Sequence, residues 1–403
     1  MLELKDFEAA ADRLKNVIHN IPLSTSCTFS ALTGAEVYLK YENQQKTGSF
    51  KVRGAYNKIM KRYAEGGLHA VVASSAGNHA QGVAFAATAV GVKSTIVMPR
   101  SAPIAKVSAT QGYGAEVVLA GSIYDEAYAK ACEICEETGA EFIHPFDDED
   151  VMAGQGTIAL EILRDLPGVD MIFVPAGGGG LISGVAACAK QINPRIQIIG
   201  VQAEGAPAIA NSFRTGERTP SETVHTIADG IAVKTPGEKT FEYIQKYVDR
   251  VVTVSDDEIA SAVLMLLERC KQVVETSGAA PLAAVLNNKV DVKGKKVVCV
   301  LSGGNIDVSF IHKIVEKGLI TRCRQLKFSV LMPDAPGALE HFSHIVAQQN
   351  ANIILFQHDR VQADLEIGEA IINVVCEVGG VDHAKRLIDT LTKDGYKVFT
   401  SQI

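Results

Sequence analysis

The chain has 403 residues, so we expect two or three domains with cores of ordinary size. Apolar residues make up 47% of it and charged residues 21%, as in a typical globular protein. The net charge of −7 argues against a protein that binds nucleic acid or an anionic membrane surface.

No targeting or membrane-spanning segment is expected. Met1 is followed by a charged, amphipathic stretch that lacks the apolar core of a secretory signal. The longest uncharged run, residues 171–189, contains Pro175 and five glycines, which indicates a buried strand, loop and helix. Eight cysteines are scattered, mostly in apolar segments, and this usage predicts reduced thiols and a cytoplasmic location.

Short β-rich runs alternate with helical patterns along most of the chain. Several of the runs are apolar on both faces, as strands buried in a parallel sheet are. The expected strands are residues 70–75, 93–99, 115–121, 141–146, 171–177, 196–204, 251–258 and 295–305. Helical patterns are found at residues 78–91, 101–112, 181–192 and 257–271. This alternation predicts an α/β fold with parallel sheets and right-handed crossovers.

The rhythm of the sequence changes after about residue 325. The order becomes strand, helix, strand and then strand, helix, strand, which predicts a βαββαβ domain of ferredoxin-like type. We therefore expect a first region over residues 1–320, a linker over 321–327 and a small domain over 328–403.

A run of four glycines follows the apolar stretch MIFVP of residues 171–175. Glycines let main-chain N–H groups surround an anion, and the N-terminus of the next helix adds unpaired N–H groups and a positive dipole end. A plain turn needs only one or two glycines, so four favour a ligand. We expect a phosphate group bound by the main chain of Gly177, Gly178, Gly179, Gly180 and Leu181.

The sequence does not carry a standard nucleotide fingerprint at this loop. The Walker pattern GxxxxGK[ST] is absent, and GxGxxG fails because Ile182 or Ser183 stands at the third glycine. Glu204, at the end of the next expected strand, does imitate the acid that binds a ribose. A nicotinamide enzyme therefore stays open as an alternative.

The stretch KTGSFKVRGA of residues 46–55 contains a candidate reactive amine. Ser49 or Thr47 is expected to cap a helix that begins near Phe50. Lys51 then lies in the first turn, where the helix dipole and partial burial both lower the pKa of its amine. A free amine condenses with aldehydes, so Lys51 and the phosphate loop together indicate pyridoxal 5'-phosphate, a phosphorylated aldehyde. We expect Arg53 to be structural.

Five motifs in this order resemble the fold-type-II pyridoxal-phosphate enzymes: GSFKVRGA, SSAGNHAQG, GGGGLISG, TIADG and LSGGN. Within that family they are most similar to the threonine and serine dehydratases and to serine racemase. The resemblance covers roughly residues 1–320. It implies two parallel-sheet domains of three layers each, with the smaller one, about residues 52–146, inserted in the larger.

The resemblance also implies roles for individual residues. Lys51 matches the lysine that forms the Schiff base, and Phe50 the aromatic residue beside the cofactor ring. Asn78 matches the asparagine bonded to the 3'-oxygen of the cofactor, and Ser302 the serine that faces the ring nitrogen. The glycine loop matches the phosphate site, and Gly230 and Glu275 line the pocket. The loop for the carboxylate of the substrate is formed by Ser75, Ala76, Gly77, Asn78 and His79.

A serine opposite the ring nitrogen implies β-elimination rather than transamination, because a neutral partner makes the ring a weaker electron sink. In the family, the amine of the lysine removes the Cα proton as general base, and the cofactor phosphate is proposed to protonate the leaving hydroxyl. The product hydrolyses to a 2-oxo acid and ammonia. Racemases of the family carry a second serine where this chain has Ala76, so we expect elimination without appreciable racemisation.

Two further sites follow from the resemblance. Glu204 matches the first acidic ligand of a cation site in some relatives, but Ala210 stands where they have a second acid. Glu204 therefore either binds a monovalent cation or is an ordinary glutamate at the end of a strand. The tail resembles an ACT-type regulatory domain, whose ligand lies near the turn that contains Asp334, Pro336 and Gly337. The tail either binds isoleucine or valine there, or only joins two copies of the chain.

The leading hypothesis is a homodimeric or homotetrameric L-threonine ammonia-lyase that makes 2-oxobutanoate, and pyruvate if L-serine is also a substrate. The enzyme alternative is a serine-preferring dehydratase or racemase. An alternative of another class is a non-catalytic amino-acid sensor, which Lys51 argues against because binding alone does not need a Schiff base.

Overall fold

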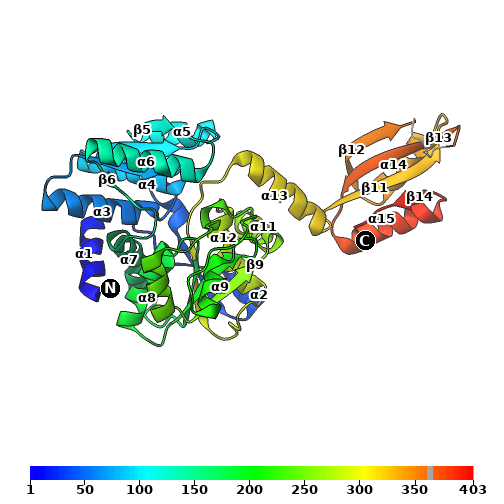
Figure 1. The fold of residues 1–403 in the computed structure, drawn as a ribbon. Coiled ribbons are helices and arrows are strands. Elements are labelled where there is room, and N and C mark those ends of the chain that lie inside the picture. Colours follow the sequence, from blue (N-terminus) through cyan, green and yellow to red (C-terminus); the bar gives the residue numbers. More distant parts are fainter. Residues whose placement is uncertain (361–365, 403) are drawn as a thin grey trace. The chain divides into compact units, whose positions relative to one another are not determined.

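The first of the two units in the chain, Met1–Ile306, is coloured from blue to yellow in Figure 1. It contains a six-stranded sheet. The computed structural model describes residues 1–360 and 366–402. The strand order is β1-β2-β10-β7-β8-β9, and every neighbouring pair is parallel except β1 with β2. The strands are β1 (Ser24–Thr25), β2 (Glu36–Tyr41), β7 (Met171–Pro175), β8 (Gln197–Ala203), β9 (Arg250–Val254) and β10 (Lys296–Leu301).

Helices cover both faces of this sheet, because its central strands are apolar on both sides. Ile172 and Val174 belong to one core, while Phe173 between them points to the opposite face. The helices that share the first core are α1 (Leu4–Leu14), α7 (Glu149–Asp165), α8 (Gly180–Ile192), α9 (Ala208–Thr215) and α10 (Glu238–Tyr247). The opposite face packs against α12 (Thr276–Leu286), which contacts α2 (Cys27–Thr33) and α11 (Asp256–Met265).

A smaller sheet of four parallel strands, in the order β5-β4-β3-β6, lies within the same unit. Its strands are β3 (Ala70–Ser74), β4 (Lys93–Met98), β5 (Glu116–Leu119) and β6 (Glu141–Phe142). One face packs on α3 (Lys51–Glu65) and α4 (Asn78–Val90), and the other on α6 (Tyr124–Thr138). The remaining helical segments of the unit are α5 (Ile104–Gly112), η1 (Glu42–Gln44), η2 (Asp229–Ile231) and η3 (Leu266–Cys270).

The second unit, Asp307–Ile403, contains an antiparallel sheet in the order β12-β13-β11-β14. Phe328 and Val330 of β11 point to one face of the sheet, where both α14 and α15 pack. The elements are α13 (Val308–Thr321), β11 (Gln325–Pro333), α14 (Ala338–Gln348), β12 (Asn352–Asp359), β13 (Glu369–Glu377), α15 (Val381–Lys393) and β14 (Lys397–Phe399).

The fold class expected from the sequence is confirmed: the first unit has parallel sheets between helices, and the second has the βαββαβ order. The boundary between the units, however, lies after Ile306 rather than after residue 320. Helix α13 clusters with the second unit, where the amide of Gln402 donates to the carbonyl of Ile320 (3.0 Å). Strand β11 begins at Gln325, inside the expected linker.

Two other elements differ from expectation. Strand β2 was not expected, although it pairs with β10 along its whole length. Its Lys40 is fully buried and interrupts what would otherwise read as an apolar run. The helix expected over 257–271 is α11, followed by a π-helical turn, Leu266–Cys270, and ended by Lys271 in a left-handed conformation (φ 59°).

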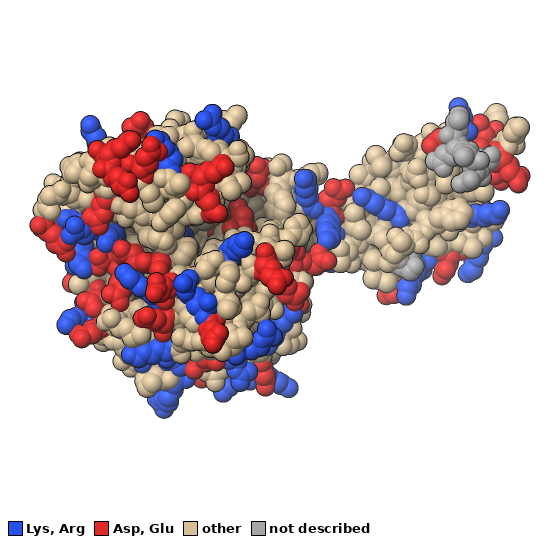
Figure 2. All heavy atoms as spheres, in the orientation of Figure 1, with Lys and Arg blue, Asp and Glu red and all other residues tan. Residues whose placement is uncertain are grey.

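Charged side chains of both signs are interspersed over the face of the molecule drawn in Figure 2. In the whole sequence, 46 acidic residues outnumber 39 basic ones. Within residues 1–360 and 366–402, no helix is long and apolar enough to cross a membrane.

Candidate active site

The segment before Lys51 is held by the end of β10. Ser49 forms an antiparallel bridge with Gly303, and the N–H of Phe50 donates to the carbonyl of Ser302 (3.0 Å). The capping prediction is wrong, because α3 begins at Lys51 without a side-chain cap, and the hydroxyls of Thr47 and Ser49 have no partner among the described residues. The bridge to β10 fixes the start of the helix instead, and so places Lys51 in its first turn.

The amine of Lys51 is buried beside a main-chain carbonyl and an aromatic ring. Its Nζ donates to the carbonyl of Pro145 (2.8 Å) and lies 5.3 Å from the centre of the Phe50 ring. Burial lowers the pKa of Lys51 to about 8, and the nearby carboxylate of Glu275 opposes this shift. A larger share of Lys51 is therefore a free amine at neutral pH than of an ordinary lysine.

Lys51 and Arg53 lie in different environments. Arg53 is fully buried and pairs through two nitrogens with Glu42 (2.8 Å each) and with Glu161 (2.7 and 2.9 Å). Glu161 also pairs with Lys40. Two buried cations thus meet two carboxylates, and the pKa of Arg53 is raised because the attraction of both carboxylates exceeds the effect of burial.

The four glycines between β7 and α8 are packed too closely to carry side chains. A Cβ on Gly178 would lie 2.4 Å from the ring of Phe146, and one on Gly180 would lie 2.8 Å from the Cα of Phe146. A Cβ on Gly177 would lie 2.9 Å from the Cα of Ile231, and Gly179 has a φ of +104°. The N-terminus of α8 has no side-chain cap, so its first N–H groups remain available to an anion.

Residues of the segment His144–Asp147 brace this glycine loop, although no role was predicted for them. Asp147 accepts from the main-chain N–H groups of Glu238 (3.1 Å) and Thr240 (3.0 Å) at the start of α10. Thr240 in turn donates through Oγ1 to the carbonyl of Gly178 (2.7 Å). His144 accepts through Nδ1 from the N–H of Asp147 (2.8 Å), which shapes the turn.

The side-chain amide of Asn78 is bonded at both ends. Its Nδ2 lies 2.9 and 3.0 Å from the two oxygens of Glu275, and its Oδ1 accepts from Nδ2 of Asn305 (2.7 Å). Burial raises the pKa of Glu275 to about 7, while the hydrogen bond from Asn78 acts in the opposite direction. No role was predicted for Asn305, although the motif LSGGN contains it.

The loop Ser75–His79 leads into α4, whose N-cap residue is Gly77 and which has no side-chain cap. The hydroxyl of Ser75 accepts from the N–H of Gly77 (3.2 Å). His79 is buried, and its Nε2 donates to the carbonyl of Ile143 (2.8 Å). Burial, with the positive charge of Lys51, lowers the pKa of His79 to about 3, so its ring stays neutral. His79 therefore fixes the loop, while the free N–H groups of the α4 N-terminus suit a carboxylate.

Contacts link the predicted residues in a closed series around one site, and we call this series the circuit. Lys51 contacts Pro145, and the neighbouring Phe146 packs on the glycine loop. A Cβ on Gly177 would meet Gly230, and a Cβ on Gly230 would lie 2.8 Å from Oγ of Ser277 and 3.7 Å from Glu275. The circuit returns to the Lys51 segment through Glu275, Asn78, Asn305 and Thr47.

The remaining predicted sites lie outside this circuit. Glu204 is 53% exposed, and its carboxylate lies 3.8 Å from Nζ of Lys289, which also pairs with Glu258 (3.0 Å). Across the described parts of the chain, no three His, Cys, Asp or Glu side chains are grouped as metal ligands. In the second unit, Asp334 accepts from Nε of Arg360 (3.1 Å), and Gly337 has a φ of +90° before α14.

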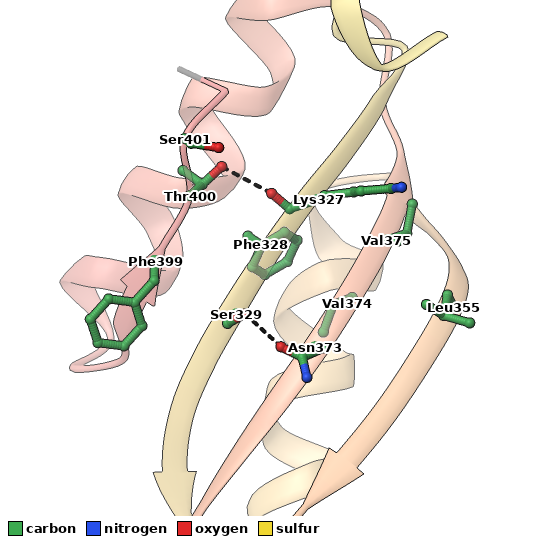
Figure 3. A pocket seen from close by; sticks show the side chains of 10 residues that line it. All are labelled: Lys327, Phe328, Ser329, Leu355, Asn373, Val374, Val375, Phe399, Thr400 and Ser401. Carbon is green, nitrogen blue, oxygen red and sulfur yellow. Dashed lines mark hydrogen bonds between the residues drawn. The ribbon is translucent and has the colours of Figure 1, made fainter. Parts of the chain in front are cut away.

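The open face of the sheet in the second unit carries a hollow of about 560 Å³ (Figure 3). Ser329 and Asn373 are hydrogen-bonded at its centre (2.6 Å). Leu355 and Phe399 beside them are 52% and 56% exposed. Half of the ten residues that line the hollow are polar, as is usual for a sheet face in water, and Leu355 and Phe399 are the exposed apolar side chains among them.

Residues 14–303 match the family described as pyridoxal-phosphate dependent enzymes. The L-threonine ammonia-lyase of Thermotoga maritima is 50% identical over 398 residues, which cover 99% of both chains. Among solved structures, a threonine deaminase from T.th. is 40% identical with a TM-score of 0.73, and covers 76% of this chain and 99% of its own. Maize serine racemase is 36% identical with a TM-score of 0.74, and covers 79% and 98%.

Proposed function

The chain belongs to the family of pyridoxal-phosphate-dependent enzymes, and from this premise we propose that it is an L-threonine ammonia-lyase. The products are 2-oxobutanoate and ammonia, and L-serine is a second substrate that gives pyruvate. The observation that carries the proposal is the position of the Lys51 amine, whose contacts lie in one circuit with the glycine loop and the amide of Asn78.

The residues of the circuit fit pyridoxal phosphate. The glycine loop leaves a cradle that any Cβ at Gly178 or Gly180 would fill, next to the uncapped N-terminus of α8. This cradle suits the phosphate, and the amine of Lys51 suits the aldehyde. Asn78 offers an N–H to the 3'-oxygen, and the buried Ser302 offers a hydroxyl to the ring nitrogen.

Different residues of the chain have different roles in β-elimination. When bound, pyridoxal phosphate supplies the electron sink that makes the Cα proton of the amino acid acidic. Lys51 takes that proton at Nζ as general base, which its lowered pKa permits near neutral pH. The N–H groups at the start of α4 bind and orient the carboxylate of the substrate. His79 is neutral and bonded to Ile143, so it holds the loop rather than transferring a proton.

Threonine and serine differ by one methyl group, which a pocket distinguishes by about 10- to 200-fold. We propose threonine as the preferred substrate, supported by the whole-length likeness to a relative of that name. A ratio of kcat/KM that favours serine would replace threonine with serine in this proposal without affecting the cofactor site.

The direct test is the formation of 2-oxobutanoate from L-threonine by the purified protein. Lys51→Ala is expected to lower kcat by at least about 100-fold, because it removes the general base. Lys46→Ala, five residues earlier in the same stretch, is the matched control and should retain activity. Borohydride treatment should attach the cofactor at Lys51. A colourless protein that binds a nicotinamide nucleotide would overturn the proposal.

We further propose that the second unit binds isoleucine or valine near Asp334, Pro336 and Gly337, and that the enzyme is a cytoplasmic homodimer or homotetramer. The βαββαβ order and the turn before α14 support an ACT-type unit, and the exposed side chains of Leu355 and Phe399 on the open face of its sheet support association. Calorimetric titration with isoleucine tests the ligand, and sedimentation tests the assembly. The monovalent cation at Glu204 stays a prediction, which activity in potassium against lithium salts would test.

A further inference from the structure

Asn305 bonds to two parts of the site that are far apart in the sequence. Its Nδ2 donates to the main-chain carbonyl of Thr47 (2.8 Å) and to Oδ1 of Asn78 (2.7 Å). Its Oδ1 packs over Gly48, where a Cβ would approach to 2.5 Å. The neighbouring Gly304 donates its N–H to the carbonyl of Gly48 (2.9 Å). The loop after β10 therefore holds the segment that leads to Lys51.

The carbonyl of Thr47 determines which way both amides face. A carbonyl oxygen only accepts, so the atom of Asn305 that faces it must be the nitrogen. The same nitrogen faces Asn78, which must therefore present its oxygen to Asn305. The nitrogen of Asn78 is then directed to Glu275, whose carboxylate accepts it. Every contact pairs a donor with an acceptor only when the amides of Asn305 and Asn78 both have this orientation.

This orientation has a consequence for the cofactor. The amide nitrogen of Asn78 carries two hydrogens, and Glu275 engages one side of it. The two oxygens of one carboxylate subtend too narrow an angle at this nitrogen to align with both of its hydrogens, so we infer that the second hydrogen is directed to an acceptor in the site. If the amide of Asn78 rotated by half a turn, an oxygen would face that acceptor and would repel it.

We propose that Asn305 is a positioning residue that keeps the amide of Asn78 turned so that it donates to the 3'-oxygen of pyridoxal phosphate. Asn305 also ties Asn78 to the chain four residues before Lys51, through the carbonyl of Thr47. The amine and the amide act on neighbouring substituents of the cofactor ring, and one side chain sets their relative place. This inference rests on the cofactor site of the proposed function, but not on the identity of the amino-acid substrate.

The test measures cofactor binding rather than turnover. Apoprotein is titrated with pyridoxal phosphate, and the dissociation constant and the visible absorption band are recorded. Asn305→Ala should weaken binding by about 10-fold, which is typical for the loss of a residue that orients a ligating group, and should shift the band. Asn305→Asp keeps the volume over Gly48 but loses the donor, and should weaken binding at least as much. An Asn305→Asp variant with the dissociation constant of the parent protein overturns the proposal.

A double-mutant cycle separates positioning from general support of the fold. If Asn305 acts mainly through Asn78, then Asn305→Asp should change the dissociation constant by a smaller factor in a protein that already carries Asn78→Ala than in the parent protein, because only the bond to Thr47 is then left to lose. An equal effect in both backgrounds overturns the proposal.

Asn57→Ala is the matched control for the loss of a buried amide. Asn57 is buried in α3 and also makes two hydrogen bonds, from Arg13 (2.9 Å) and to the carbonyl of Asp150 (2.7 Å). Its loss should lower the thermal midpoint while the cofactor band and affinity stay unchanged. If the parent protein binds pyridoxal phosphate but does not convert threonine, the proposed substrate fails while this inference stands. If it does not bind the cofactor, both fail.

Discussion

Lys51 is subject to two opposed influences. Burial lowers the pKa of its amine to about 8, and the carboxylate of Glu275 acts to raise it. Only the free amine condenses with an aldehyde. The reactivity of the site should therefore follow the ionisation of this one group.

We expect the rate at which apoprotein captures pyridoxal phosphate to rise with pH between about 7 and 9, with a midpoint near the pKa of about 8. The rate rises with pH because only the free amine reacts. The lowered pKa of Lys51 makes the free amine the main form at a lower pH than in an ordinary lysine. Stopped-flow absorbance of the cofactor measures this rate. A rate that is still rising steeply above about pH 10 would show that Lys51 titrates as an ordinary surface lysine.

Glu275 should affect stability in a pH-dependent way. Its pKa of about 7 lies above its usual value of 4.5, so the folded protein binds the proton more tightly than the unfolded chain does. Stability contributed by this proton is present at low pH and is lost as pH rises from 4.5 to 7. Glu275→Gln replaces the carboxyl group with a neutral amide, so this pH-dependent loss of stability does not occur in the variant. It should raise the unfolding free energy of the apoprotein at about pH 8, by at most about 3 kcal/mol, and should have little effect at about pH 4.5.

Denaturant unfolding of both proteins at the two pH values measures this difference. A gain for Glu275→Gln that is equal at both pH values would mean that ionisation of the carboxyl is not its cause.

Ala76 is expected to limit the enzyme to elimination. Its methyl group cannot transfer a proton, and the resemblance of the motifs implies a serine at this position in racemases of the family. Chiral chromatography should find no D-amino acid with the parent protein and a measurable amount with Ala76→Ser. Strong racemisation by the parent protein would contradict this interpretation.

At the scale of elements, the glycine loop depends on the turn that packs on it. Gly178→Ala would place a methyl group 2.4 Å from the ring of Phe146, so either the loop or the ring must move. We expect a cost of about 1–3 kcal/mol in the free energy of unfolding and a loss of cofactor affinity. Gly168→Ala is the matched control, because the nearest atom to its Cβ is 4.0 Å away at the flexible end of Lys296. Calorimetry and cofactor titration compare the two, and equal effects would contradict the argument.

The sequence predicts best the elements whose pattern is local. The buried strand β7 and the four glycines after it follow from neighbouring residues. The cap at Ser49 was wrong because a distant partner in the sequence, Gly303, holds that segment instead. Strand β2 was missed because Lys40 reads as a surface residue until Glu161 of α7 is placed beside it.

The same limit applies to the site. The roles of Pro145, Phe146 and Asn305 depend on contacts across the fold, with Lys51, the glycine loop and Asn78. Asn305 lies in the motif LSGGN, but nothing adjacent in the sequence shows what its amide faces. Long-range partners of this kind require the tertiary structure.

At the scale of the whole molecule, the two units divide catalysis and regulation in our proposal. The threonine deaminase from T.th. matches 76% of this chain with 99% of its own, so that relative folds without a counterpart of the remaining quarter. A chain that ends at Ile306 should therefore keep its activity towards threonine and lose any response to isoleucine. Assays with and without isoleucine measure both. Loss of cofactor binding on truncation would show that the first unit needs the second.

The buried pairing of Arg53 and Lys40 with Glu42 and Glu161 has a consequence for the history of the sequence. Removing one member leaves an uncompensated buried charge, at a cost of about 3–5 kcal/mol, which is a large part of the stability of a typical domain. Single substitutions at these positions should therefore be purged by selection, and lineages should change them only in compensating combinations. Arg53 lies two residues from the reactive lysine, but we expect its ion pairs with Glu42 and Glu161, and not the reaction, to limit which substitutions it tolerates.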